Sequence, residues 1–143
     1  MFLEQLSNAH GVSGNETAVR ELILEKIKPH IDEYRVDALG NLIAVKHMRT
    51  RGKGRARRAL RVMLDAHMDE VGLLIVKADK EGYLRFKKVG GLDDRVLPSK
   101  IVHIGADKVP GVIGFKPAHL TKSEERQRIP ESDTLTIDIG AKS

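Results

Sequence analysis

The sequence predicts an α/β fold in its first half, followed by a small all-β, barrel-like region. Three observations lead to this prediction. Residues 15–27 carry apolar side chains at helical spacing, and apolar runs suited to strands follow them. After Gly72 no long amphipathic pattern recurs, and short β-rich runs alternate with turn residues. We therefore expect an α/β portion over residues 1–69 and a β-rich portion over residues 70–143.

Two helices are predicted at the start of the chain. Residues 2–9 form a short amphipathic stretch, and the apolar stripe of residues 15–27 indicates a longer helix. Ser13 and Glu16 have the spacing of a capping box, in which the two side chains satisfy backbone N–H groups at a helix start. Pro29 disfavours helical backbone at the residue before it and should end the helix.

Strands are predicted on both sides of a basic segment. Residues 31–36 and 41–45 flank a turn that ends at Gly40, and residues 60–66 contain an apolar run long enough for a buried strand. Further strands are predicted in the second portion over residues 71–78, 83–89, 100–104, 109–115 and 135–139.

The net charge of +5 comes from one segment. Residues 46–61 hold eight basic residues and no acid, while the remaining chain has 17 basic and 20 acidic residues. Such a cluster could bind phosphates in a salt-dependent way. The alternative is a solvated loop between two strands. Aromatic residues make up 3% of the chain and Trp is absent, which argues against a nucleic-acid-stacking platform.

Composition excludes some classes of protein. Without cysteine the chain can form neither disulfides nor thiolate metal sites. No apolar run approaches the length of a membrane span, and we see no signal-peptide pattern, so no membrane partner and a cytoplasmic location are expected.

The candidate site follows the apolar run of residues 60–66. His67 and Asp69 are two residues apart, so in an extended chain their side chains share one face. Neutral imidazole is a common ligand of zinc, cobalt or nickel. A nearby carboxylate can also bind the metal, or it can accept the other ring N–H and orient the ring. The alternative is a histidine at a strand end that is simply hydrogen-bonded to Asp69.

The segment Ala66–Gly72, with the sequence AHMDEVG, resembles the first metal-ligand motif of the M42 family of metallo-aminopeptidases. Further segments match the family in its order along the chain: Gly11–Glu16, Asp37–Leu42, Val89–Leu92, Gly111–Pro117 and Ile137–Ala141. Each match alone is weak, but six in order along the whole chain are specific.

This resemblance implies a fold and an activity. Residues 1–69 would be the N-terminal portion of a mixed-sheet, zinc-peptidase-like catalytic domain, and residues 70–143 an incomplete β-rich inserted dimerisation or lid domain. The family hydrolyses N-terminal residues from peptides at a site holding two metal ions, zinc or cobalt, and its dimers build a dodecamer. By resemblance His67 is a metal ligand and Asp69 is the catalytic-site carboxylate that orients it, whereas Glu70 closes a turn or forms an ion pair.

Most of the family's site is not encoded here. Its bridging Asp, its Glu-Glu pair with the general base, a further Asp and a final His would follow the inserted domain. A catalytic zinc takes about three protein ligands, so His67 and Asp69 do not complete a site. Three hypotheses stay open. The chain is a truncated or split member that is inactive alone and needs a second chain; it is a non-catalytic, self-associating remnant; or it binds anions or nucleic acid through residues 46–61.

Other polar residues are expected to have structural roles. His10 should be a solvated loop residue, because no partner lies at a recognised spacing. His119 should serve packing or an interface. Asp93 and Asp94 could look like a paired-carboxylate site, but a solvated turn after two glycines is the preferred interpretation.

Overall fold

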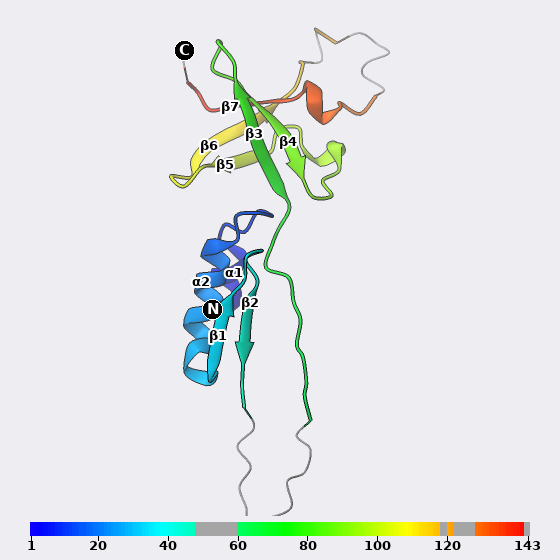
Figure 1. The fold of residues 1–143 in the computed structure, drawn as a ribbon. Coiled ribbons are helices and arrows are strands. Elements are labelled where there is room, and N and C mark those ends of the chain that lie inside the picture. Colours follow the sequence, from blue (N-terminus) through cyan, green and yellow to red (C-terminus); the bar gives the residue numbers. More distant parts are fainter. Residues whose placement is uncertain (48–59, 118–119, 122–127, 142–143) are drawn as a thin grey trace, which may run out of the picture. The chain divides into compact units, whose positions relative to one another are not determined.

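The computed structural model describes residues 1–47, 60–117, 120–121 and 128–141. The chain divides into two compact units, Met1–Glu70 and Val71–Ser143 (Figure 1). Within the described ranges, none of the helices has the length and apolar content that crossing a membrane requires.

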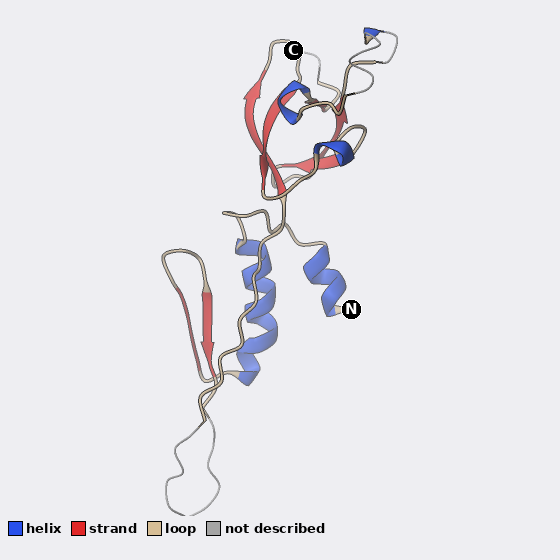
Figure 2. Ribbon diagram, turned by 90° about the vertical axis from the view of Figure 1, so that its right-hand side faces the viewer, coloured by secondary structure: helices blue, strands red, loops and turns tan. Residues whose placement is uncertain are grey.

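The first unit is a mixed α/β arrangement. Its elements are α1 (Phe2–Ser7), α2 (Thr17–Ile27), the 3₁₀ turn η1 (Lys28–His30), β1 (Glu33–Val36) and β2 (Leu42–Val45). β1 and β2 pair antiparallel, and α2 lies alongside this hairpin in both ribbon views (Figures 1 and 2). The predicted helices and the two predicted strands of this hairpin are confirmed, and α2 ends just before Pro29 as expected.

The turn of the hairpin is built by its own side chains. Asp37 accepts hydrogen bonds from the Asn41 side-chain amide over 2.9 Å and from the backbone N–H groups of Asn41 and Leu39 over 2.9 and 3.0 Å. These bonds, that of the Asn41 side chain most of all, lower the pKa of the Asp37 carboxyl group. Gly40 adopts a left-handed φ of 87°, which glycine tolerates at no steric cost. Arg20 donates to the Gly40 carbonyl over 3.0 Å and so ties the turn to α2.

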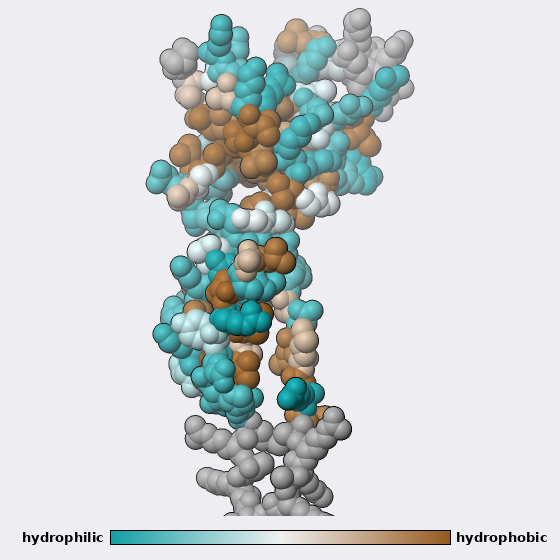
Figure 3. Space-filling model, viewed as in Figure 1, coloured by the Kyte–Doolittle hydropathy of each residue, from teal (hydrophilic) through white to brown (hydrophobic). Residues whose placement is uncertain are grey.

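The prediction of a strand over residues 60–66 is wrong. These residues form no strand, and Leu60 and Leu64 are 83% and 93% exposed. Figure 3 shows hydrophobic side chains along this segment. A strand needs a neighbour that accepts and donates its backbone hydrogen bonds. Among the described residues, the nearest pairing is the isolated parallel bridge between Val12 and Glu70.

The second unit is a curled antiparallel sheet of five strands in the order β3-β4-β7-β6-β5 (Figure 1). The strands are β3 (Gly72–Ala78), β4 (Leu84–Val89), β5 (Ile101–Ile104), β6 (Val109–Gly114) and β7 (Thr136–Asp138). The 3₁₀ turns η2 (Asp94–Val96) and η4 (Ser132–Thr134) connect parts of it. All five strands were expected, and none of their ends differs from its predicted position by more than one residue, because alternating apolar runs between turn residues mark them clearly.

The core of this unit lies on one face of the curled sheet. Its buried residues are Phe86, Leu97, Ile113, Leu135 and Ile137. The backbone of β6 packs closely against this core at Gly111, where an added Cβ would lie 2.6 Å from Ile137 and 2.8 Å from Ile104. The core therefore depends on a residue without a side chain at that position.

Candidate functional site

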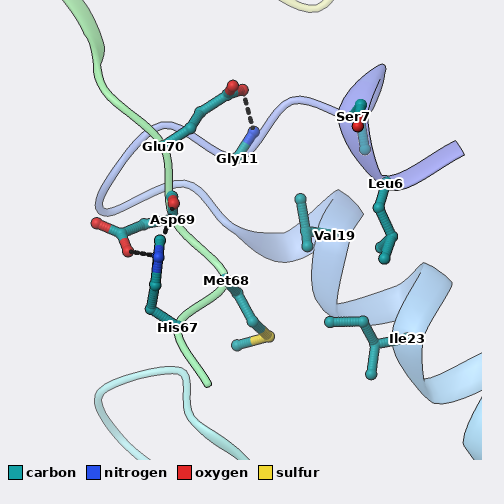
Figure 4. Close-up of a pocket in the computed structure, with 10 residues that line it drawn as sticks. Leu6, Ser7, Gly11, Val19, Ile23, His67, Met68, Asp69 and Glu70 are labelled. Carbon is teal, nitrogen blue, oxygen red and sulfur yellow. Dashed lines mark hydrogen bonds and ion pairs between the residues drawn. The ribbon is translucent and has the colours of Figure 1, made fainter. Parts of the chain in front are cut away.

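Two segments that are distant in the sequence meet in the first unit. Glu70 N–H donates to the Gly11 carbonyl over 2.7 Å, and Ser13 N–H donates to the Glu70 carbonyl over 3.3 Å. The Glu70 carboxylate also accepts from Gly11 N–H over 3.2 Å (Figure 4). Glu70 therefore joins these two segments by hydrogen bonds, which differs from the expected local turn or ion pair. Gly11 is required by space, because a Cβ there would lie 2.8 Å from Val19 and 3.1 Å from the Met68 carbonyl.

This contact places Asp69 beside the ring of His67. The ring nitrogen Nδ1 lies 2.9 Å from Oδ1 of Asp69 and 3.0 Å from the Asp69 backbone carbonyl (Figure 4). Both oxygens are acceptors, so Nδ1 carries the proton and donates it. In the neutral ring the lone pair is then on Nε2, the atom that can bind a metal. Among the described residues Nε2 makes no hydrogen bond.

Ser13 is a third member of this constellation that sequence reasoning missed. Its hydroxyl donates to Oδ2 of Asp69 over 2.6 Å, across a separation of 56 residues. The predicted capping box is wrong: the N-cap of α2 is Glu16, and the Glu16 carboxylate accepts from Gly14 N–H over 2.5 Å. The spacing of Ser13 and Glu16 predicted a hydrogen bond within the helix start, but the Ser13 hydroxyl donates to the distant Asp69 carboxylate instead. The Gly11–Glu16 motif was the available signal.

The electrostatics favour an ionised Asp69. The hydrogen bond from Ser13 is the main cause that lowers the pKa of the Asp69 carboxyl, and the hydrogen bond to His67 adds to it. An ionised carboxylate only accepts hydrogen bonds, so both neighbours act as donors. The carboxylate thus holds the ring through Nδ1 and leaves Nε2 available for coordination.

The ring faces solvent. The His67 side chain is 85% exposed and that of Asp69 is 42% exposed. Beside them lies a pocket of about 230 Å³ whose lining includes Leu6, Val19 and Met68 (Figure 4). His67 is therefore not turned into an apolar interior, and further ligands have room to approach it.

The structure does not bring enough ligands together for a complete metal centre. Within the described part of the chain, no three side chains of His, Asp or Glu gather closely enough to hold a metal ion. His47 is instead paired with Glu33 over 2.8 Å, which raises the pKa of its ring. His103 lies in β5, and His30 lies in η1.

Two further expectations have different outcomes. The prediction that His10 is solvated is wrong, because its Nε2 is buried and has no partner among the described residues. Its neighbour Gly11 is buried as well. Asp93 and Asp94 do lie in a turn, where they pair with Arg95 and Lys88 over 2.5 and 2.7 Å. These ion pairs agree with the structural interpretation of the two carboxylates.

Two predictions concern residues outside the described ranges. His119 is one of them. The other is most of the basic segment 46–61, of which residues 48–59 are not described.

Comparison with known proteins identifies the class of protein. Residues 40–143 match the model of the M42 glutamyl aminopeptidase family, so the chain belongs to this family. The family's enzymes are metal-dependent aminopeptidases.

Particular relatives cover nearly all of the chain. It is 35% identical over 147 residues to a lysyl aminopeptidase of Pyrococcus furiosus, a match that covers 99% of the chain and 40% of the relative. The solved structure of a TET aminopeptidase from Thaumarchaeota archaeon SCGC AB-539-E09 is 35% identical, with a TM-score of 0.84 over 99% of the chain and 38% of that structure. A TET1 peptidase of Pyrococcus horikoshii, which can assemble into a tetrahedron or a large octahedral shell, is 40% identical, with a TM-score of 0.76 over 100% of the chain and 42% of that structure.

The chain is much shorter than these proteins. It spans 36% to 40% of the length of the first curated relatives that it matches.

Proposed function

We propose that residues 1–143 supply His67 and Asp69 to the two-metal site of an M42-type metallo-aminopeptidase, which removes N-terminal residues from peptides. His67 binds one of two zinc or cobalt ions through Nε2, and Asp69 orients it. The remaining ligands and the general-base Glu come from polypeptide outside residues 1–143. The residues described here therefore do not catalyse the reaction by themselves.

The main support for a metal-binding role is the way in which Asp69 holds the exposed ring of His67. His67 presents an exposed Nε2 without a partner among the described residues, while Nδ1 is held by Asp69 over 2.9 Å. A metal-ligating histidine ordinarily donates its other ring N–H to a carboxylate or carbonyl in this way.

The donor set fits a divalent metal but does not complete its shell. Imidazole nitrogen and carboxylate oxygen suit zinc and cobalt. When bound, the metals supply Lewis-acid polarisation of the peptide carbonyl and a low-pKa water. The chain's own contribution is to hold the Asp69 carboxylate and the Nδ1 proton of His67 in place.

The second unit supports a proposal about assembly. We infer that the β-rich residues 70–143 belong to an inserted dimerisation or lid domain, and that the complete protein forms homo-oligomers. The assembly of the Pyrococcus horikoshii peptidase into closed shells supports this inference. Within the described residues, β3 and β5 are the edge strands of the sheet, and edges offer backbone groups for further pairing.

Zinc titration of the isotope-labelled chain tests the metal site. Long-range ¹⁵N spectra report each histidine ring separately, so background binding at other histidines does not obscure the result. We expect Nε2 of His67 to respond to zinc ahead of the other rings, and His67→Ala to remove that binding event while His103→Ala leaves it. If the other histidine rings respond to zinc and Nε2 of His67 does not, the proposal is contradicted.

A further inference from the structure

We propose that Ser13 is a positioning residue for the metal ligand: its hydroxyl fixes the Asp69 carboxylate, and the carboxylate in turn fixes the His67 ring. This inference rests on the proposed function. Ser13 Oγ lies 2.6 Å from Oδ2 of Asp69, and Nδ1 of His67 lies 2.9 Å from Oδ1 of the same carboxylate. Each carboxylate oxygen is thus assigned to a different donor.

The backbone delivers the Ser13 hydroxyl to this place. Ser13 N–H donates to the Glu70 carbonyl over 3.3 Å, and Glu70 N–H donates to the Gly11 carbonyl over 2.7 Å. Asn15 N–H closes the turn by donating to the Val12 carbonyl over 2.7 Å. The hydroxyl and the carboxylate therefore belong to two backbone segments that are hydrogen-bonded to each other next to the contact, through the N–H and carbonyl of Glu70.

The hydrogen bond from Ser13 limits the rotation of the Asp69 carboxylate. Without such a partner a carboxylate rotates easily about its terminal bond, because the torsional preference there is broad. With Ser13 on Oδ2, rotation of the carboxylate is restricted and Oδ1 stays directed at the ring. The hydroxyl is not used to cap α2, whose N-cap is Glu16.

The orientation of the Asp69 carboxylate influences which ring nitrogen of neutral His67 carries the proton. A fixed Oδ1 favours the form with the proton on Nδ1, which leaves the lone pair on Nε2. Without Ser13 the carboxylate loses its fixed orientation, so the form with the proton on Nε2, which cannot bind a metal through that atom, gains population.

The test is long-range ¹⁵N NMR of the full chain without metal, about two pH units above the ordinary histidine pKa of about 6.5. We expect the Nδ1–H form of His67 to dominate. Ser13→Ala should lower the ratio of Nδ1–H to Nε2–H about threefold, the effect of one modest hydrogen bond. Ser13→Thr, which keeps the hydroxyl, should restore the ratio.

Ser7→Ala is the matched control, because it removes a hydroxyl from the lining of the pocket beside His67 and Asp69 but leaves the hydrogen bond from Ser13 to Asp69 in place. It should leave the ratio unchanged. An unchanged ratio in Ser13→Ala overturns the inference, and a fall that Ser13→Thr does not restore marks a packing effect and overturns it too. Zinc is added afterwards. A ratio that behaves as expected, together with no zinc at Nε2, supports Ser13 as the positioning residue while the proposed metal role fails.

Discussion

Single side chains determine the chemistry of the first unit. The imidazole of His67 is useful to a metal only through Nε2, and the contacts at Nδ1 decide where its proton lies. Asp69 makes both of those contacts, one through its carboxylate and one through its backbone carbonyl. Because Asp69 holds Nδ1 and the metal would bind Nε2, we expect the Asp69 carboxylate to raise the affinity for the metal without touching it.

Replacing Asp69 tests this expectation. Asp69→Asn should weaken zinc binding at Nε2 of His67 about 10- to 100-fold, the usual cost of losing the carboxylate behind a metal-bound histidine. The measurement is the zinc titration followed at the ring nitrogens. Asp65→Asn, an equal change at a residue two positions before His67, should leave the affinity as it is. Equal affinities in wild type and Asp69→Asn would contradict the assigned role.

A second residue-scale prediction concerns pH. The Arg95 side chain beside Asp93 lowers the pKa of that carboxyl from 3.8 to about 2. Because the folded pKa lies below the unfolded one, the stability from this pair is present above pH 3.8 and is lost as the pH falls through about 2. Asp93→Asn keeps a helix-capping side chain but removes the charge.

The melting temperatures of wild type and Asp93→Asn should therefore differ by a constant amount above this window and converge within it. Circular dichroism melts over a pH series measure the difference. Arg95→Gln removes the other partner and should show the same convergence. A difference that stays constant down to about pH 2 would exclude the ion pair as its source.

At the scale of the elements, the sequence correctly predicted the helices and strands whose ends are marked by side chains within the element and its flanking turns. The strands of the second unit were located to within one residue because alternating side chains and turn residues mark both ends. The strand over residues 60–66 failed because a strand also requires a partner, which an apolar run does not encode. The prediction of the capping box failed for a related reason, since the Ser13 hydroxyl donates its hydrogen bond to Asp69, far away in the sequence.

The candidate site was predictable only in part. His67 and Asp69 could be found because their spacing is short and sits beside an apolar run. Ser13 could not be assigned, because its contact with Asp69 spans 56 residues and depends on the tertiary turn at Gly11.

Close packing in the sheet gives an element-scale prediction. Gly111→Ala places a methyl group 2.6 Å from Ile137, a fully buried and stiff side chain, and should lower the free energy of unfolding by about 1–3 kcal/mol. Gly91→Ala is the control, since a Cβ there meets nothing within 4 Å and should change stability by less than about 0.5 kcal/mol. Urea denaturation measures both. Equal effects of the two substitutions would contradict the packing argument.

At the scale of the whole molecule, we propose one explanation for the exposed apolar segment and for the ligand set that the described residues leave incomplete. The chain matches only 36% to 40% of its first curated relatives, and Leu60 and Leu64 are left uncovered. We expect polypeptide outside residues 1–143 to pair with residues 60–66 and to bring the remaining ligands to His67. The same polypeptide would then cover the exposed apolar segment and complete the metal site.

The most direct test is a hybrid in which residues 1–143 replace the matching part of the Pyrococcus furiosus lysyl aminopeptidase. We expect a folded, metal-dependent aminopeptidase. His67→Ala should lower its metal content and reduce its activity about 100-fold or more, while His103→Ala should change neither. A folded hybrid whose metal content and peptide hydrolysis are unaffected by His67→Ala would contradict the role of His67 as a metal ligand.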